Sequence, residues 1–215
     1  MKIKQWIGLC IIVLGISIFS SYFIEWYTAR KSAESLTSNE IKKYQATTPI
    51  KEINRNIINK TRTSSTEQQP IQIPASEVNH QSGEKVAYLI IPKIEKKYSV
   101  YWGADDEILK KGVGMFVSEL TTTPSGNGHT VLSGHRDTVF TELNQLQKDD
   151  QLIVEYENKT YTYKVEKHWI TDSEDRTVIV QKENSILSLT TCYPFNYIGD
   201  APDRYIIEAR LVSTS

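Results

Sequence analysis

Three residue types with complementary chemistry occur in the second half of this 215-residue chain: Cys192, His135 and Arg204. A thiolate is a strong nucleophile, an imidazole exchanges protons near neutral pH, and a guanidinium is a permanent cation rich in hydrogen-bond donors. Together such groups can supply a nucleophile, a group that gives or takes a proton, and a fixed positive charge. If the fold brings the three residues together in one cleft, Cys192 is a candidate nucleophile.

Cys192 lies near the end of the run ILSLTTCYPF, which has the pattern of a strand. Side chains alternate along a strand, so Ser188, Thr190 and Cys192 share one face. Pro194 ends the strand, because proline has no N–H for the ladder. The alternative is a buried, inert cysteine, so the surrounding residues must decide between the two readings.

His135 and Arg204 also lie at predicted strand ends. His135 follows the short apolar run VLSG, and Arg204 precedes the run YIIEARL. Taken singly, each is more typical of a solvated loop or a surface ion pair. Three strand ends can meet in one cleft when an antiparallel barrel brings distant strands together, and that arrangement is our hypothesis.

The pattern from Lys85 onward predicts an all-β sandwich or barrel, because short β-rich runs alternate with turn residues. The runs are VAYLIIP, YSVYWG, GVGMFVS, HTVLSG, QLIVEYENKTYTYKVEKHWI, SILSLTTC and RYIIEARLV. Residues 157–159 (ENK) predict a hairpin turn. Residues 105–111 and 141–146 predict short helical turns, the second with Thr141 as its cap.

The N-terminus carries the apolar run from Trp6 to Ile24, long enough to cross a hydrocarbon core of about 30 Å. Lys2 and Lys4 precede it and Glu25 follows, so the positive-inside rule predicts a cytoplasmic N-terminus. A cleavable signal peptide is the alternative, but no A-x-A-like site follows the run. We therefore predict a transmembrane anchor in residues 1–25 and an extracytoplasmic remainder.

Residues 26–83 predict a polar juxtamembrane linker, with at best short helices in its first half and a Ser/Thr/Gln/Pro-rich tether from Thr61. Tyr44 is one of few apolar side chains in it that could dock on the domain that follows. The catalytic domain is predicted at 84–215. The net charge of −1 argues against a nucleic-acid partner, and neither histidines nor cysteines have zinc-site spacing. We expect no cofactor and no metal.

The ordered words VAYLIIPKI, KGVGMF, GHTVLSGHRDTVF, SLTTCYPF and APDRYIIEARL resemble the sortases, membrane-anchored cysteine transpeptidases of Gram-positive bacteria. The resemblance covers roughly Lys85 to Leu211. GHRDT beside TTCYPF and a closing DRYIIEA is most similar to class D. The family's cysteine motif is usually TLxTC, and here Ser188 stands at its first position, which keeps a hydroxyl there.

The resemblance implies a closed barrel of about eight strands with short helices, preceded by one transmembrane helix. It implies Cys192 as nucleophile, His135 as proton donor to the leaving amine, and Arg204 as donor to the oxyanion or substrate carbonyl. Thr191 is a candidate for a further donor. Four residues are candidates to line an apolar groove for a substrate Leu-Pro: Val113, Ile198, Ala201 and Pro202.

By the same resemblance, the enzyme cleaves an LPxTG-like sorting signal and transfers the protein to an amine of a peptidoglycan precursor. One alternative is a pilin-polymerising sortase that uses a lysine amine, and another is a cysteine peptidase that only hydrolyses. A papain-like peptidase usually has its cysteine before its histidine, which is the reverse of the order here. A non-enzymatic β-domain for adhesion would leave Cys192 dispensable.

Overall fold

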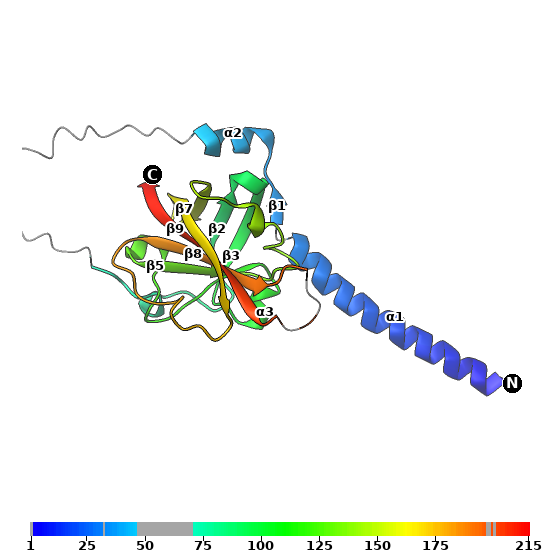
Figure 1. Cartoon of the computed structure of the whole chain (residues 1–215). Helices are drawn as coiled ribbons and strands as arrows, with labels where there is room; N and C mark the ends of the chain where they lie inside the picture. Colours follow the sequence, from blue (N-terminus) through cyan, green and yellow to red (C-terminus); the bar gives the residue numbers. More distant parts are fainter. Residues whose placement is uncertain (1, 32, 47–70, 197–198, 200) are drawn as a thin grey trace, which may run out of the picture.

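The computed structural model describes residues 2–31, 33–46, 71–196, 199 and 201–215, which form a β-barrel with one long helix leaving its side (Figure 1). The helices are α1 (Lys2–Lys31), α2 (Ser38–Ala46) and α3 (Asp106–Leu109). Short 3₁₀ helices occur at Ala75–Glu77, Pro92–Ile94, Pro124–Gly126 and Leu143–Gln145. The strands are β1 (Ala33–Ser35), β2 (Lys85–Ile91), β3 (Lys96–Trp102), β4 (Val113–Met115), β5 (His129–Ser133), β6 (Gln151–Tyr156), β7 (Lys159–Asp172), β8 (Ile186–Tyr193) and β9 (Asp203–Thr214).

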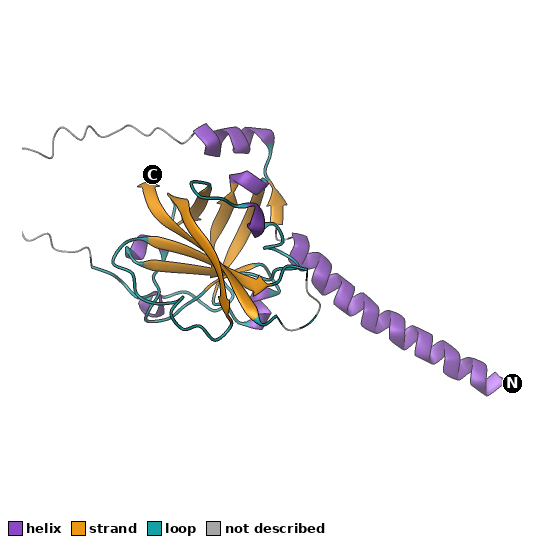
Figure 2. Ribbon diagram, viewed as in Figure 1, coloured by secondary structure: helices purple, strands orange, loops and turns teal. Residues whose placement is uncertain are grey.

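The strands of the described residues form one sheet in the order β1-β3-β2-β6-β7-β9-β8-β5-β4. A parallel pairing of β4 with the end of β3 closes strands β2 to β9 into a ring (Figure 2). β1 pairs with the beginning of β3 and stays outside the ring. The predicted all-β closed barrel is therefore confirmed.

The barrel is filled by every second side chain of its strands. Leu89, Val154, Leu189 and Ile207 come from four different strands, and none of them is exposed. Alternation in a strand places their sequence neighbours on the outer face. The core consequently dictates which face of β8 carries Cys192, because Leu189 points inward and the residues at even positions point outward.

The outer face of β5, β8 and β9 is itself covered. Val131 and Ile206 point outward, yet they are 0% and 1% exposed. The connection between β7 and β8 passes over them, since the Val180 carbonyl accepts a hydrogen bond from His129 Nδ1 on β5 (2.7 Å). Toward the ends of β5 and β8 the cover is incomplete, because Ser133, Thr190 and Cys192 are only partly buried.

The predicted turns have mixed outcomes. Tyr156 pairs with Lys159, and Glu157 and Asn158 both have positive φ (50° and 59°), which makes the hairpin a two-residue type I′ turn. The helical turns lie near both predicted places, and Asp105 caps α3 by accepting from the Ile108 amide. The prediction that Thr141 caps the second turn is wrong. The 3₁₀ helix there begins at Leu143, so Glu142 stands at the cap position, and it makes no side-chain cap hydrogen bond.

Candidate active site

Cys192 and Arg204 come together because β8 and β9 run antiparallel. Their registered pairing places Cys192 directly opposite Arg204, so both side chains project from the same, outer face. Cys192 is a free thiol and is partly buried, as Arg204 is. The core decides this orientation, because the inward-facing residues on either side of the pair are Thr191 and Tyr205.

His135 reaches the same place through the parallel pairing of β5 with β8. The register ends at Ser133 opposite Thr190, and the Gly134 amide still donates to the Thr190 carbonyl (3.1 Å). One residue further, the Thr191 hydroxyl donates to the Gly134 carbonyl (2.7 Å). The backbone of His135 therefore leaves β5 beside the end of β8, at the level of Cys192.

The turn that carries His135 is tightly packed. The Phe140 amide donates to the His135 carbonyl (2.9 Å), which closes the turn, and the Phe140 ring is fully buried. A Cβ on Gly134 would lie 2.7 Å from Val139 Cγ2 and 2.8 Å from Phe140 Cδ2. A larger residue at this position would therefore force the Val139 and Phe140 side chains, or the turn itself, to shift.

The guanidinium of Arg204 is anchored on its own connection. Its Nη1 donates to the carbonyls of Ala201 (3.2 Å) and Asp203 (3.0 Å). A second arginine, Arg136, contacts the same connection, because its Nη2 donates to the Gly199 carbonyl (2.7 Å). The turn after His135 and the connection before Arg204 are thereby tied to each other.

A third strand, β7, lies next to Arg204 on the side away from Cys192. Thr171 on β7 is the registered partner of Arg204, and its hydroxyl donates to Asp175. The hydrogen bonds from Thr171 and then Thr177 hold the pKa of the Asp175 carboxyl below its ordinary value. Sequence reasoning missed this carboxylate, because its place depends on the long-range pairing of β7 with β9.

The five candidate substrate residues are placed differently. Thr191 is buried with its hydroxyl on Gly134, and Val113 is a fully buried member of the barrel core. Ala201 is partly buried and Pro202 exposed, both in the connection that anchors Arg204. Ile198 lies outside the described residues.

Sequence reasoning also missed the role of His129. Its Nδ1 donates to Val180 of the covering connection, and its Nε2 accepts from the Ser188 hydroxyl (2.8 Å). Burial lowers the pKa of His129 below its ordinary value, so the ring is neutral in this arrangement. The hydroxyl expected at the first position of TLxTC was the available signal, since Ser188 is the donor that this imidazole needs.

A buried carboxylate ties down the same connection. Glu208 on β9 forms ion pairs with Lys167 (3.1 Å) and with Lys182 of the β7–β8 connection (3.2 Å). Burial alone would raise the pKa of Glu208, but the hydrogen bonds from the two lysines outweigh it and hold the pKa below its ordinary value. The cover over the outer face is therefore held at Lys182 as well as at Val180.

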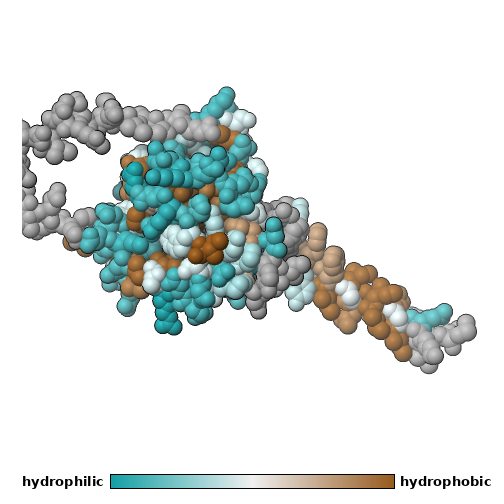
Figure 3. Space-filling view, in the orientation of Figure 1, coloured by the Kyte–Doolittle hydropathy of each residue, from teal (hydrophilic) through white to brown (hydrophobic). Residues whose placement is uncertain are grey.

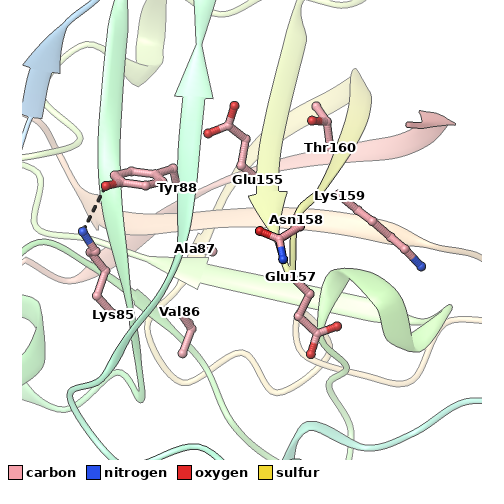
Figure 4. A pocket seen from close by; sticks show the side chains of 9 residues that line it. All are labelled: Lys85, Val86, Ala87, Tyr88, Glu155, Glu157, Asn158, Lys159 and Thr160. Atoms are coloured by element: carbon pink, nitrogen blue, oxygen red, sulfur yellow. Dashed lines mark hydrogen bonds between the residues drawn. The ribbon is translucent and has the colours of Figure 1, made fainter.

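A surface pocket of about 420 Å³ lies elsewhere, between β2 and the β6–β7 hairpin (Figure 4). Its side chains include Lys85, Tyr88, Glu155 and Lys159, and none of the predicted site residues lines it. In the described part of the chain, no group of three or more His, Cys, Asp or Glu side chains is arranged to hold a metal ion. The strand register places the thiol of Cys192 opposite Arg204 and level with the backbone of His135, and these three residues form the candidate active site.

Comparisons with known proteins agree with this arrangement. A family model described as the sortase domain matches residues 89–212. The chain is 42% identical over 134 residues to Sortase D of Bacillus subtilis, an alignment that covers 62% of this chain and 67% of that protein. The catalytic domain of B. anthracis SrtD is 70% identical, with a TM-score of 0.57 and coverage of 65% of this chain and 95% of that one. A Clostridium perfringens Sortase D5 transpeptidase is 25% identical, with a TM-score of 0.57 and coverage of 63% and 83%.

Proposed function

This chain belongs to the sortase family of cysteine transpeptidases, and from that premise we propose that it cleaves an LPxTG-like sorting signal and transfers the protein to a cell-wall amine. Its similarity to two class D sortases makes it a class D member. The observation that supports the proposal most is the registered pairing of Cys192 with Arg204, at the level where β5 delivers His135.

In the first step the Cys192 thiolate attacks the carbonyl carbon of the threonine in the signal. The C–N bond to the following glycine breaks, and the new amine takes a proton from His135, which leaves a thioacyl-enzyme. In the second step an amine attacks the thioester carbonyl, loses a proton to the imidazole and releases the thiolate. Water as the acceptor would give hydrolysis at the same site.

Arg204 stabilises the oxyanion of both tetrahedral intermediates in this mechanism. Its guanidinium is anchored on carbonyl oxygens of the adjoining backbone, so part of its donor fork is already oriented before substrate binds. A preorganised donor costs little reorganisation as charge develops on the oxygen. Thr191 serves as a positioning residue in this proposal, because its hydroxyl ties the backbone beside Cys192 to the backbone beside His135.

The proposed location is the cell membrane. Gln5–Ile24 is long and apolar enough to span a bilayer, and none of it is buried against the rest of the chain. Figure 3 shows apolar side chains over this part of α1, in contrast to the polar surface of the barrel. We propose an anchor in residues 1–25 with a cytoplasmic N-terminus, and an extracytoplasmic catalytic domain at 84–215.

Mass spectrometry of the full chain in detergent tests this proposal. The enzyme is incubated with a panel of LPxTG-like peptides, with and without a free amine, beside a Cys192→Ala control. The expected result is an acyl adduct on the protein and an amine-transfer product, both absent in the control. Hydrolysis that never yields to added amine would make the protein a peptidase, and the absence of any adduct on an alkylatable thiol would rule out this substrate class.

The same assay separates the two possible acceptors. A peptidoglycan-stem amine and a lysine-containing pilin peptide are supplied in competition, and the ratio of the two products is read by mass. Preference for the stem amine is expected for cell-wall anchoring, whereas preference for the lysine peptide would favour pilin polymerisation.

A further inference from the structure

Two isoleucines on the outside of the barrel are fully covered. Ile90 on β2 and Ile153 on β6 are registered partners that point away from the core, yet they are 0% and 1% exposed. An apolar pair on an outer barrel surface needs a cover to be shielded from water. The segment that covers this pair follows α1 directly in the chain.

That cover is residues 33–46, here called the strap, which comprises β1 and α2. Leu36 and Tyr44 of the strap are 7% and 4% exposed and form one apolar cluster with Ile90 and Ile153. Ile41 packs against the same cluster. The strap thus buries its own apolar side chains and those of the barrel in a single contact.

Polar contacts define how the strap lies. β1 pairs antiparallel with the beginning of β3, and the Leu36 amide donates to the Glu95 carbonyl (2.9 Å). At the other end, the Tyr44 hydroxyl donates to Glu155 Oε1 (2.8 Å), and burial followed by this hydrogen bond raises the pKa of Tyr44. Glu155 also pairs with Lys97 of β3 (3.3 Å), so the carboxylate that accepts from Tyr44 is held by a barrel lysine as well.

The strap has a strong local folding signal of its own. The Thr37 amide donates to Glu40 (2.9 Å) and the Glu40 amide donates to the Thr37 hydroxyl (3.4 Å), which is a capping box at the start of α2. Leu36 and Ile41 stand at the two positions of a hydrophobic staple around that box. Local sequence and tertiary docking therefore specify the same conformation.

The strap changes how the barrel is connected to the membrane. α1 continues past Ile24 to Lys31, and β1 begins at Ala33, so about 10 Å of helix separates the apolar span from the docked strand. The chain after the strap returns to the barrel by Ala75, whose amide donates to the Thr121 carbonyl (2.8 Å). The chain therefore contacts the barrel in residues 33–46, before residues 47–70, and the first connection from the apolar helix to the barrel is the strap.

We propose that the strap holds the catalytic barrel close to the membrane surface, so that Cys192 works at a fixed, short height on substrates that present their scissile bond there. The inference rests on the membrane anchoring in the proposed function. In this proposal the docked strap connects the membrane helix to the barrel, in place of the long polar tether expected for residues 26–83. The pocket of Figure 4 lies beside this contact and shares Tyr88 and Glu155 with it.

Two insertions of equal length test the proposal in full-length protein reconstituted in phosphatidylglycerol-containing vesicles. A flexible Gly/Ser segment of twenty residues, roughly 25 Å in mean span, is placed either after Lys31 or after Lys60. A Cys10→Ser chain is labelled with a donor dye at Cys192, and energy transfer to an acceptor lipid reports the height. The insertion after Lys31 should lower transfer, and the insertion after Lys60 should leave it at the wild-type value. Equal loss from both insertions would show that residues 47–70 are the tether, and loss from neither would show that the barrel adheres to lipid without the strap.

A second variant tests whether docking of the strap is the reason why the insertion after Lys60 leaves energy transfer unchanged. In a Leu36→Asp, Tyr44→Asp chain the strap should detach, so the insertion after Lys60 should now lower transfer as well. An unchanged result in that background would overturn the role of the strap. Vesicle flotation separates the two proposals, because a chain that does not float contradicts membrane anchoring and this inference with it, while peptide transfer by Cys192 is measured independently in detergent.

Discussion

Cys192 on β8 and Arg204 on β9 are directly opposed partners on the outer face of the barrel. They lie twelve positions apart in the chain (204 − 192), and the antiparallel ladder rather than the connecting segment sets their relationship. The guanidinium is in turn anchored on Ala201 and Asp203, so its direction depends on the connection that precedes β9. Catalysis should therefore depend on the shape of this cation and not only on its charge.

Arg204→Lys is expected to lower kcat about 10²- to 10³-fold, the usual effect of removing one oxyanion donor. Lysine keeps the charge but loses the planar fork that bonds the backbone and the oxyanion together. Steady-state transpeptidation kinetics measure the effect. Arg210→Lys is the matched control, because Arg210 is on the same strand but pairs with Glu166 at the surface, and it should retain wild-type turnover. Near-normal turnover of Arg204→Lys would exclude the oxyanion role.

Gly134→Ala is expected to reduce activity by about tenfold or more, because misplaced catalytic groups slow the reaction, and to lower the melting temperature. The added Cβ would meet Val139 and Phe140 at less than 3.0 Å, so the turn that carries His135 must shift. Since Phe140 is fully buried, it has little room to yield. Thermal unfolding and the rate of thioacyl formation are the measurements.

The control for this substitution is Gly15→Ala on α1, where a Cβ would meet nothing within 4 Å. That variant should behave as wild type in both assays. A fully active Gly134→Ala protein would mean that the position of His135 tolerates movement, contrary to the packed turn.

Arg136→Gln is expected to lower kcat/KM by about tenfold while leaving the free energy of unfolding within about 0.5 kcal/mol of wild type. The arginine ties the turn after His135 to Gly199 in the connection before Arg204, and an exposed hydrogen bond of this kind adds little stability. Kinetics and denaturant unfolding are measured on the same preparation. Parallel losses of kcat/KM and of the free energy of unfolding would indicate a purely structural residue. Unchanged kinetics would show that catalysis does not need the hydrogen bond between the two connections.

Much of the barrel could be predicted from sequence because alternating apolar residues mark each strand. The pairing of strands is a different matter, since β5 lies parallel beside β8 across more than fifty residues of chain. Cys192, His135 and Arg204 could be named because they stand in recognisable motifs. Thr171 and Asp175 could not, because their place beside Arg204 depends on the pairing of β7 with β9. Val113 shows the same limit, because an apolar side chain in a strand fits a groove or a core, and it is buried in the core.

The strap shows what composition hides. Residues 33–46 are mostly polar, and their composition predicted little beyond short helices. The signal lay in spacing: Thr37 with Glu40, flanked by Leu36 and Ile41, is a helix start, and Tyr44 completes its apolar face one turn later. The docking partner was beyond prediction, since Ile90 and Ile153 look like ordinary strand residues until the pairing of β2 with β6 places them outward.

The last prediction concerns pH and the buried His129. Burial lowers its folded-state pKa below the ordinary value of 6.5, which we take for the unfolded chain. Between the two values the unfolded chain binds a proton that the folded chain does not, so the free energy of unfolding falls as the pH drops below about 6.5 and levels off below the folded-state pKa. Each unit of difference in pKa is worth about 1.4 kcal/mol.

His129→Gln should remove this part of the pH dependence, although it lowers stability overall because Val180 and Ser188 lose well-placed partners. Urea unfolding at intervals from pH 5 to 8 gives both curves, and their difference isolates the histidine. Lys182 and Glu208 also face the ring, but the pKa of Glu208 is held below 4.5, so its loss of stability occurs at lower pH. Parallel curves for wild type and variant across pH 5 to 8 would show that His129 is protonated as readily in the folded chain as in the unfolded one, and that its bond to Ser188 does not require the neutral ring.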